Sequence, residues 1–301
     1  MKTRFIESHL CGGLGNQMFQ YAVGRAISSR LQVPLCLNIN AFTTAIDGPA
    51  HARWRLPLFP NAIGSDVCVS TSRLHVCLWR ISLFAQAHLH LHIPLLPRII
   101  REPHFEYWQG VESISAPCHL YGYWQSERYF SRYADQIRKD FAFPALPDGR
   151  PQALAARIKA CSTAVSVHIR RGDYISNPSA AAFHGLPGME YYRAALAYIR
   201  AQAGEATVFV FSDEPQWVRE NFDACGHALE VVDLNMPEAP QHDMHLMAMC
   251  RHHIIANSSF SWWGAWLSER EGITVAPSRW FADPTVNTND LCPPTWLRLE
   301  S

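Results

Sequence analysis

The sequence predicts an α/β fold with parallel sheets covered by helices, divided into two domains. In the second half, short apolar runs rich in Val, Ile and Phe alternate with segments whose apolar residues have helical spacing. The first half opens with a strand, a glycine-rich loop and a helix. The stretch Phe143–Pro151 contains three prolines and one glycine, which is typical of a linker. We therefore expect domains at residues 1–147 and 148–301.

The elements of the first half are predicted from a few apolar runs. Strands are expected at Phe5–Leu10, Val33–Asn38 and His119–Trp124, and helices at Gln17–Leu31 and Ser126–Phe141. Residues 41–66 have the composition of loops.

The second half is predicted as five buried strands with helices between them. The expected strands are Ala164–Ile169, Val208–Phe211, Leu229–Val232, His253–Ala256 and Ile273–Ala276. The expected helices are Met189–Ala203, Pro215–Phe222, Asp243–Arg251 and Trp262–Arg270.

The composition is that of a folded chain without a charge bias. The 301 residues are 48% hydrophobic and 17% charged, which excludes a mostly disordered chain. Basic and acidic residues both number 26, so wholesale nucleic-acid binding has no support. The nine cysteines are odd in number and never three residues apart, so neither a disulfide framework nor a zinc knuckle is predicted. The sequence shows no signal peptide and no long apolar run, so we expect a cytoplasmic protein without a membrane-spanning helix.

Residues 67–101 combine basic and apolar side chains. They contain no acid, four arginines and four histidines among many Leu, Ile, Val and Phe residues. One interpretation is a helical hairpin packed on its own domain. The other is a basic amphipathic surface that rests on the inner face of the cytoplasmic membrane or holds a lipid-linked substrate. His88, His90 and His92 have leucine neighbours and no nearby acid, and we predict no zinc site there.

The strongest cluster of chemical groups is His168-Ile169-Arg170-Arg171-Gly172-Asp173-Tyr174, which begins where a predicted strand ends. Ligands of parallel sheets bind at the carboxyl ends of the strands. A guanidinium fork grips phosphate oxygens in a bidentate way, so Arg170 and Arg171 suit a phosphate or diphosphate. Asp173 could orient an arginine or accept a proton. The alternative is a structural network of arginine and aspartate.

Polar residues also follow the neighbouring predicted strands. They are Ser212, Asp213 and Glu214 after one strand, Asp233 after the next, and Asn257, Ser258, Ser259, Phe260 and Ser261 after a third. The last group starts a helix, so its hydroxyl and N–H groups could bind phosphate. Helix capping alone is the alternative for each site taken singly. The tryptophans that follow Ser261 are interpreted as core packing.

The N-terminal loop Cys11-Gly12-Gly13-Leu14-Gly15-Asn16-Gln17 lies between a predicted strand and a helix, a position from which backbone can approach phosphates. It lacks the Lys-Ser/Thr pair of a Walker loop and fits the dinucleotide fingerprint poorly. No two aspartates are separated by one residue, so the pair that holds a metal–diphosphate complex in many sugar transferases is absent. If a diphosphate leaves here, arginines are expected to replace the metal.

Four ordered motifs resemble those of the α-1,2-fucosyltransferases of glycosyltransferase family 11. They lie at Gly12–Tyr21, His168–Tyr174, Phe211–Glu214 and Asn257–Trp266, and together they extend over nearly the whole chain. The resemblance implies a GT-B-like fold, in which two Rossmann-like domains with parallel sheets face a cleft. The N-terminal domain would be the acceptor side and the C-terminal domain would bind the GDP-sugar. The last residues of the chain would pack back on the N-terminal domain.

The resemblance also implies a reaction. Fucose would pass from GDP-β-L-fucose, with inversion, to the 2-hydroxyl of a galactose, with no metal and no other cofactor. The acceptor would be a galactose-terminated oligosaccharide or a lipid-linked glycan, used in surface polysaccharide or O-antigen synthesis. The alternatives are a transferase that uses another nucleotide sugar and a non-catalytic protein that binds glycan or nucleotide.

The same resemblance implies residue roles. Arg170 and Arg171 would hold the GDP phosphates, His168 would contact the nucleoside and Asp243 would contact guanine. The donor-binding set is completed by Ser212, Asp213, Asn257, Ser258, Ser259 and Phe260, and the loop residues Gly13, Gly15, Asn16 and Gln17 would lie near the cleft. One-step inversion calls for a base near the acceptor hydroxyl. Asp173 is the first candidate and His184 and Glu214 are rivals, unless the sugar cation forms early and no base is needed.

Overall fold

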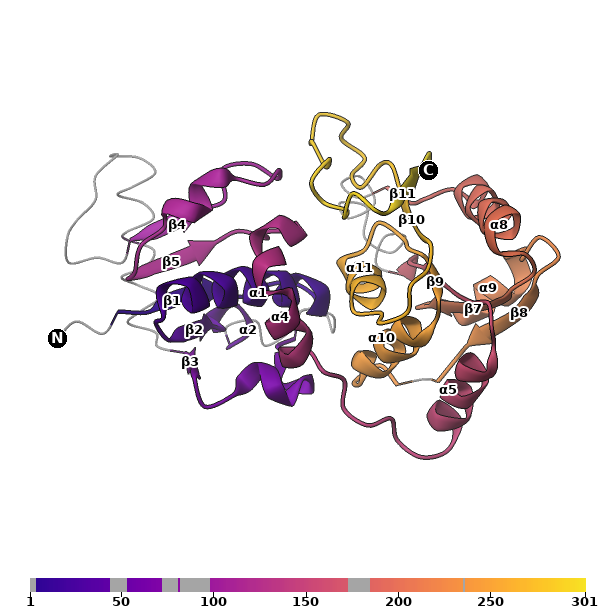
Figure 1. Cartoon of the computed structure of the whole chain (residues 1–301), viewed down its shortest axis with the longest axis horizontal. Coiled ribbons are helices and arrows are strands. Elements are labelled where there is room, and N and C mark those ends of the chain that lie inside the picture. The colour runs from indigo at the N-terminus through magenta and orange to yellow at the C-terminus, as the bar shows by residue number, and fades with distance from the viewer. Residues whose placement is uncertain (1–3, 44–52, 72–80, 82–97, 173–184, 235) are drawn as a thin grey trace. The chain divides into compact units, whose positions relative to one another are not determined.

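The computed structural model describes residues 4–43, 53–71, 81, 98–172, 185–234 and 236–301. The chain forms two compact units, unit 1 (Met1–Ala142) and unit 2 (Phe143–Ser301) (Figure 1). The division falls between Ala142 and Phe143, whereas the sequence placed it after residue 147.

Unit 1 contains a five-stranded parallel sheet in the order β3-β2-β1-β5-β4. The strands are β1 (Ile6–His9), β2 (Leu35–Asn38), β3 (Val67–Ser70), β4 (Ile99–Arg101) and β5 (Cys118–Tyr121). The two edge strands, β3 and β4, were not predicted. Both lie at the edges of the sheet and are only partly buried, so they lack the buried apolar run that marks the inner strands.

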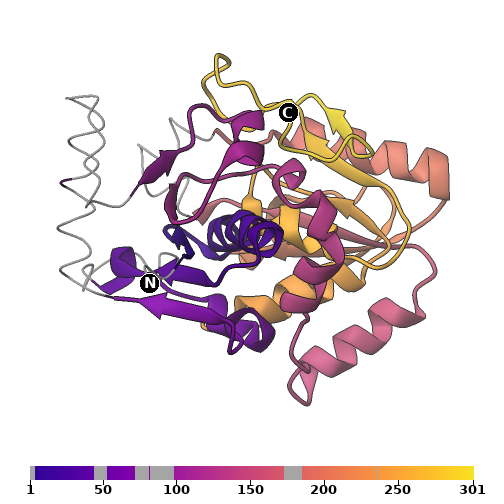
Figure 2. The same ribbon diagram turned by 60° about the vertical axis from the view of Figure 1, so that its left-hand side comes forward.

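The helices of unit 1 include one long element that follows the glycine-rich loop. They are α1 (Leu14–Leu31), α2 (Asn40–Thr43) and α4 (Ala134–Asp140), with short 3-10 turns at Leu56–Leu58, Pro60–Ile63, Gln109–Ser113, Glu127–Tyr129 and Ser131–Tyr133. Helix α1 lies along one face of the sheet (Figures 1 and 2). The helix predicted over 126–141 is α-helical only from Ala134 onwards, because Phe130 adopts φ −136°, which interrupts the helical path.

Unit 2 contains a six-stranded parallel sheet in the order β11-β10-β9-β6-β7-β8. The strands are β6 (Ala164–Ile169), β7 (Thr207–Ser212), β8 (Ala228–Val232), β9 (His252–Ile254), β10 (Thr274–Pro277) and β11 (Leu297–Leu299). The helices are α5 (Arg150–Ala160), α8 (Met189–Ala203), α9 (Pro215–Asn221), α10 (Pro240–Met249) and α11 (Ser259–Trp266). The five predicted strands and four predicted helices are all present.

Helices cover both faces of the sheet in unit 2. Helices α8 and α9 pack on the face that carries Val165, Val167 and Val208. Helices α5 and α10 pack on the face that carries Phe209 and Phe211. The predicted α/β fold with two units, each built on a parallel sheet, is confirmed.

Two elements of unit 2 were not predicted. Helix α5 begins inside the stretch assigned to the linker, and its Pro151 lies in the first turn, where proline is compatible with a helix. Strand β11 pairs with β10 in the sheet of unit 2.

Cysteine pairing also differs from the expectation. Cys36 and Cys68 lie opposite each other on β2 and β3 and form a disulfide. The sequence predicted no disulfides, because partners 32 residues apart are not visible until the strand register is known.

No helix in the described part of the chain is long and apolar enough to cross a membrane. Most of residues 67–101 lies outside the described residues, including His88, His90 and His92.

Candidate active site

The carboxyl ends of β6 and β7 bring two predicted motifs together in unit 2. The two strands are parallel neighbours, and Ile169 pairs with Ser212. Arg170 and Arg171 therefore lie beside Asp213 and Glu214. This placement follows from the sheet order and matches the predicted position of a ligand site at the carboxyl ends of the strands.

Asp213 organises the turn that carries the arginines. Its Oδ1 accepts a hydrogen bond from the N–H of Arg171 at 3.0 Å, and its Oδ2 accepts one from the N–H of Gly172 at 3.1 Å. The same Oδ2 lies 3.3 Å from Nε of Arg170. A Cβ atom on Gly172 would lie 3.0 Å from Oδ2, so a larger residue would displace the carboxylate. Asp213 thus fixes both the backbone of the turn and the direction of Arg170.

Arg171 has a different environment from Arg170. Its Nε lies 3.1 Å from Oε2 of Glu214, and its guanidinium lies 3.5 Å from the centre of the Trp217 ring. The stacked and paired guanidinium anchors the turn to α9. These contacts correspond to the structural network that the sequence left open as an alternative. They also engage Glu214, one of the candidate bases.

His168 is a neutral, buried imidazole. It is 5% exposed, and its backbone carbonyl accepts a hydrogen bond from the hydroxyl of Tyr192 at 3.1 Å. Burial, with a smaller contribution from the charge of Arg170, lowers the pKa of His168 to about 3. Its Nδ1 is buried and has no hydrogen-bond partner among the described residues. A ligand could satisfy this atom.

The turn after β9 caps α11. The Ser258 hydroxyl accepts a hydrogen bond from the N–H of Phe260 at 3.3 Å, and the Ser261 hydroxyl donates to the Ser258 carbonyl at 3.2 Å. Nδ2 of Asn257 donates to the carbonyls of Gly185 and Trp280, at 3.2 Å each. Ser258 therefore caps α11, and Asn257 holds the turn in place. The tryptophans of α11 are buried, as predicted.

Asp243 lies in α10 with an unusual carboxyl group. Its Oδ1 is buried and has no hydrogen-bond partner among the described residues. Burial and the nearby charge of Asp233 raise the pKa of Asp243 to about 6. Two residues later in α10, the ring of His245 stacks on Phe143 with centroids 4.6 Å apart. Asp243 thus carries a buried carboxylate oxygen that no described residue satisfies.

The glycine-rich loop belongs to unit 1, where buried amides hold its shape. Gly12 has φ +75°, which favours glycine. Nε2 of Gln17 donates to the carbonyls of Gly12 and Arg53, at 2.9 and 2.8 Å, and Oε1 accepts from the N–H of Arg55 at 2.9 Å. Gln17 is fully buried, and its three hydrogen bonds hold the loop in shape. Asn16 accepts a hydrogen bond from Gln125 at 2.7 Å.

Within unit 2 the structure joins the motifs that follow β6 and β7, and within unit 1 it orders the glycine-rich loop. Asp173 and His184, two of the candidate bases, lie outside the described residues. Among the described residues, no cluster of three or more metal-ligating side chains occurs.

The sequence did not single out Glu102, Tyr123 or Gln20, which lie around the loop. A glycine between aromatic residues at a strand end, Gly122, was the available signal.

Comparison with known proteins identifies the relatives of this chain. The model of the family "Glycosyl transferase family 11" matches residues 98–300. An α-1,2-colitosyltransferase of Escherichia coli is 34% identical over 98% of this chain and 99% of its own. The O-antigen biosynthesis glycosyltransferase WbnK of Escherichia coli is also 34% identical, over 98% of this chain and 100% of its own. The galactoside α-(1,2)-fucosyltransferase 1 of Saimiri sciureus is 29% identical over 52% of this chain and 44% of its own.

Proposed function

The chain belongs to glycosyl transferase family 11, and from this premise we propose that it transfers L-fucose from GDP-β-L-fucose to the 2-hydroxyl of a terminal galactose. The transfer proceeds with inversion and without a metal. The observation that carries the proposal is the Arg170 guanidinium, held by Asp213 at the carboxyl end of β6. We place the acceptor among the glycans of O-antigen or surface polysaccharide synthesis, because one full-length relative is named for O-antigen biosynthesis.

The charge of the leaving group explains the arginine. Breaking the sugar–phosphate bond builds negative charge on GDP, and a guanidinium already in position stabilises that charge more in the transition state than in the ground state. Asp213 provides this positioning. A guanidinium carries five N–H donors, so pairing through Nε is compatible with phosphate binding at the Nη groups. We assign phosphate binding to Arg170 and support of the turn to Arg171.

The nucleoside contacts are assigned to His168 and Asp243. Guanine presents two neighbouring N–H donors, which suit the two oxygens of a carboxylate. A buried acceptor without a partner costs about 1–3 kcal/mol, and guanine would remove that cost at Oδ1 of Asp243. The neutral imidazole of His168 can offer its unpartnered Nδ1 to the nucleotide, as donor or acceptor according to its tautomer.

A second candidate donor is GDP-colitose. The specific observation in its favour is the full-length relative named as an α-1,2-colitosyltransferase. Colitose is fucose without the 3-hydroxyl, so both donors present the same GDP group and the same leaving-group chemistry. The assignments of Arg170, His168 and Asp243 hold for either donor.

Donor turnover tests the proposal. The purified protein is incubated with lactose and with GDP-fucose, GDP-colitose, GDP-mannose or UDP-galactose, with and without EDTA, and the products are followed by NMR. We expect GDP-fucose to be consumed in EDTA and the product to carry an α-1,2 linkage. If the protein used GDP-colitose exclusively, GDP-colitose would replace GDP-fucose as the proposed donor. Loss of turnover in EDTA would contradict the proposal that no metal is needed. GDP binding without turnover on any galactoside tried would favour the non-catalytic alternative.

Peripheral membrane contact through residues 67–101 stays a prediction from their composition. Cosedimentation with anionic vesicles at low salt and release at high salt would support it. Absence of binding at low salt would remove it.

A further inference from the structure

Glu102 occupies the carboxyl edge of the sheet in unit 1. It directly follows β4, whose last residue, Arg101, pairs with Tyr121 at the end of β5. Its Oε2 accepts a hydrogen bond from the N–H of Tyr123 at 2.7 Å, and its Oε1 accepts one from the N–H of Trp124 at 2.9 Å. The carboxylate therefore lies over the turn that follows β5.

The close approach of Glu102 depends on Gly122. A Cβ atom at position 122 would lie 2.4 Å from Cβ of Glu102. This distance is too short for any side chain, so only glycine fits at position 122. Two residues later, buried Trp124 has φ +57°, a left-handed conformation that an L-residue rarely adopts. Non-glycine residues in this conformation cost about 1–3 kcal/mol and cluster at functional sites. The turn is thus shaped against local preference, and the Glu102 carboxylate helps to hold it.

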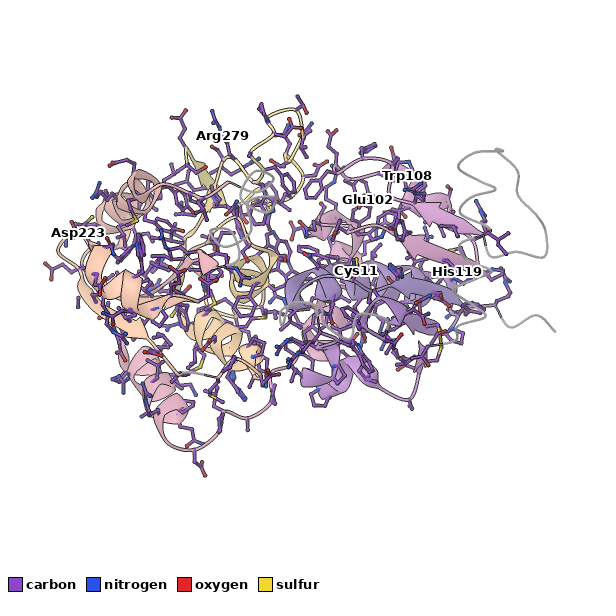
Figure 3. All side chains as sticks on the ribbon, turned by 180° about the vertical axis from the view of Figure 1, so that it is seen from behind. Cys11, Glu102, Trp108, His119, Asp223 and Arg279 are labelled. Carbon is purple, nitrogen blue, oxygen red and sulfur yellow. A yellow bond between two sulfur atoms is a disulfide. The ribbon has the colours of Figure 1, made fainter. Side chains whose placement is uncertain are left out.

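The turn is joined to the glycine-rich loop by one buried amide. Gln20 donates to the carbonyl of Gly122 at 3.1 Å and accepts from the N–H of Cys11 at 2.9 Å. Figure 3 shows Cys11 and Glu102 toward the same end of the unit 1 sheet, with His119 of β5 lying farther along it. The ends of β1, β4 and β5 therefore form one continuous hydrogen-bonded edge.

Glu102 differs in its charge environment from the acids at the edge of unit 2. Asp213, Glu214 and Asp233 each pair with an arginine, whereas Glu102 has no ion pair with any described residue. A carboxylate offers about four lone-pair positions, and the two N–H donors occupy two of them. Burial raises the pKa of Glu102 to about 7, opposed by its two backbone hydrogen bonds. The Glu102 carboxylate is partly exposed and can accept hydrogen bonds from further donors.

Tyr123 adds an aromatic surface beside this carboxylate. Its side chain is 45% exposed, although its backbone N–H is bound to Glu102. Burial raises the pKa of its hydroxyl, and the charges of Cys11, Tyr121 and Glu102 raise that pKa further. A pyranose has a rim of hydroxyl donors and an apolar C–H face. An acceptor carboxylate next to an exposed ring matches both.

We propose that Glu102 and Tyr123 bind the acceptor sugar, with the Glu102 carboxylate accepting a hydrogen bond from an acceptor hydroxyl and the Tyr123 ring covering the C–H face. The proposal rests on the proposed function for the identity of the acceptor, a β-galactoside. It assigns the acceptor to unit 1 through residues of that unit alone. Glu102 is an acceptor-binding residue whose hydrogen bonds to the turn also position Tyr123.

Steady-state kinetics of the full chain test the proposal with lactose as acceptor. The variants are Glu102→Gln, Tyr123→Ala and Tyr123→Phe, with Glu112→Gln as a control for loss of an exposed acid in the same unit. A hydrogen bond to a charged group is worth about 1.5–3 kcal/mol, so Glu102→Gln should raise the lactose KM about 10-fold or more. Tyr123→Ala should act likewise and Tyr123→Phe should stay near wild type. The GDP Kd should be unchanged in all four.

The pH profile separates acceptor binding from support of the turn. Protonation removes the negative charge of the carboxylate and turns one of its oxygens into a donor, so kcat/KM for lactose should fall as the pH drops below about 7. Glu102→Gln should lose this dependence, and melting curves show whether it is folded. Glu102→Asp, which keeps the charge, should recover part of the affinity. An unchanged lactose KM and pH profile in folded Glu102→Gln would overturn the proposal.

Failure of the proposed function is a separate outcome. If the wild-type protein transfers no sugar, binding of lactose and other β-galactosides is measured without donor by saturation-transfer NMR. Binding to the wild type that is lost in Glu102→Gln and kept in Glu112→Gln would still support this subsite. Equal binding to both, or no galactoside bound by the wild type, would overturn it.

Discussion

At the scale of single residues, acidic partners decide what each arginine can do. Asp213 pairs with Nε of Arg170 and also accepts hydrogen bonds from two backbone N–H groups. Glu214 and the Trp217 ring both take the guanidinium of Arg171. The two adjacent arginines of this motif therefore have different contacts, which the spacing of the motif does not reveal.

Replacement of Arg170 should slow the chemical step. Arg170→Ala should lower kcat at least 100-fold, about 3 kcal/mol, by analogy with the loss of one oxyanion donor. Arg170→Lys should recover only part, because an ammonium lacks the bidentate fork. The control is Arg157→Ala, which removes an exposed arginine paired with Glu230 in the same unit. Near-normal turnover of Arg170→Ala at saturating donor would show that this assignment is wrong.

The carboxyl group of Asp243 should make GDP binding pH-dependent. Its pKa is raised to about 6, and only the ionised form accepts both guanine N–H groups. GDP affinity, measured by calorimetry, should therefore fall as the pH drops below about 6. The terminal phosphate of GDP titrates in the same range, so the comparison with Asp243→Asn isolates the protein group. Parallel pH profiles for the two proteins would contradict the assignment.

At the scale of elements, the sequence predicted the inner strands and the helices between them. It missed the edge strands of unit 1 and the contacts between distant segments. Strand β6 is fully buried and was predicted to the residue. The prediction of a buried strand at Leu229–Val232 was wrong about burial: β8 lies at the edge of the sheet, and Leu229 is 41% exposed. The edge strands β3 and β4 are only partly buried and show no buried apolar run. The ends of the predicted strands located Arg170, because parallel strands end at one edge.

Contacts between distant segments were beyond prediction. Asp213 reaches N–H groups about forty residues earlier, and Glu102 reaches N–H groups about twenty residues later. Such side-chain-to-backbone bonds depend on strand order and leave no trace in spacing or composition. For this reason the sequence treated Asp213 as one donor-binding residue among several and did not distinguish Glu102 at all.

The start of α11 offers a test that separates capping from phosphate binding. Ser258→Ala should lower the free energy of unfolding by about 1 kcal/mol through loss of the cap. Ser258→Asp keeps an N-cap acceptor and should keep the stability. If phosphate binds at this helix start, the added negative charge should weaken GDP binding about 10-fold or more. Unchanged GDP affinity in Ser258→Asp would leave Ser258 with the capping role alone.

At the scale of the whole molecule, each unit has its own sheet, its own core and its own polar carboxyl edge. The formal net charge of the chain is zero, so no overall field concentrates an anionic nucleotide. Under the proposed function, recognition of GDP is therefore assigned to local groups, Arg170 and Asp243 in unit 2. Recognition of the acceptor is assigned to Glu102 and Tyr123 in unit 1.

This division predicts that donor and acceptor protect different units from amide hydrogen exchange. GDP at 100 times its Kd stabilises the bound state by about 2.7 kcal/mol, so exchange through local opening should slow about 100-fold at the site. We expect the strongest slowing by GDP in peptides covering 168–172 and 257–262, and by lactose in peptides covering 120–126.

The variants give this measurement its controls. Arg170→Ala should abolish the GDP effect at 168–172 and leave the lactose effect, whereas Glu102→Gln should do the reverse. Each ligand stabilises only the segments whose open form cannot bind it, so the two losses should be independent if the sites use separate residues. Protection by GDP concentrated at 120–126, or loss of both effects in one folded variant, would refute the assignment of the two substrates to separate units.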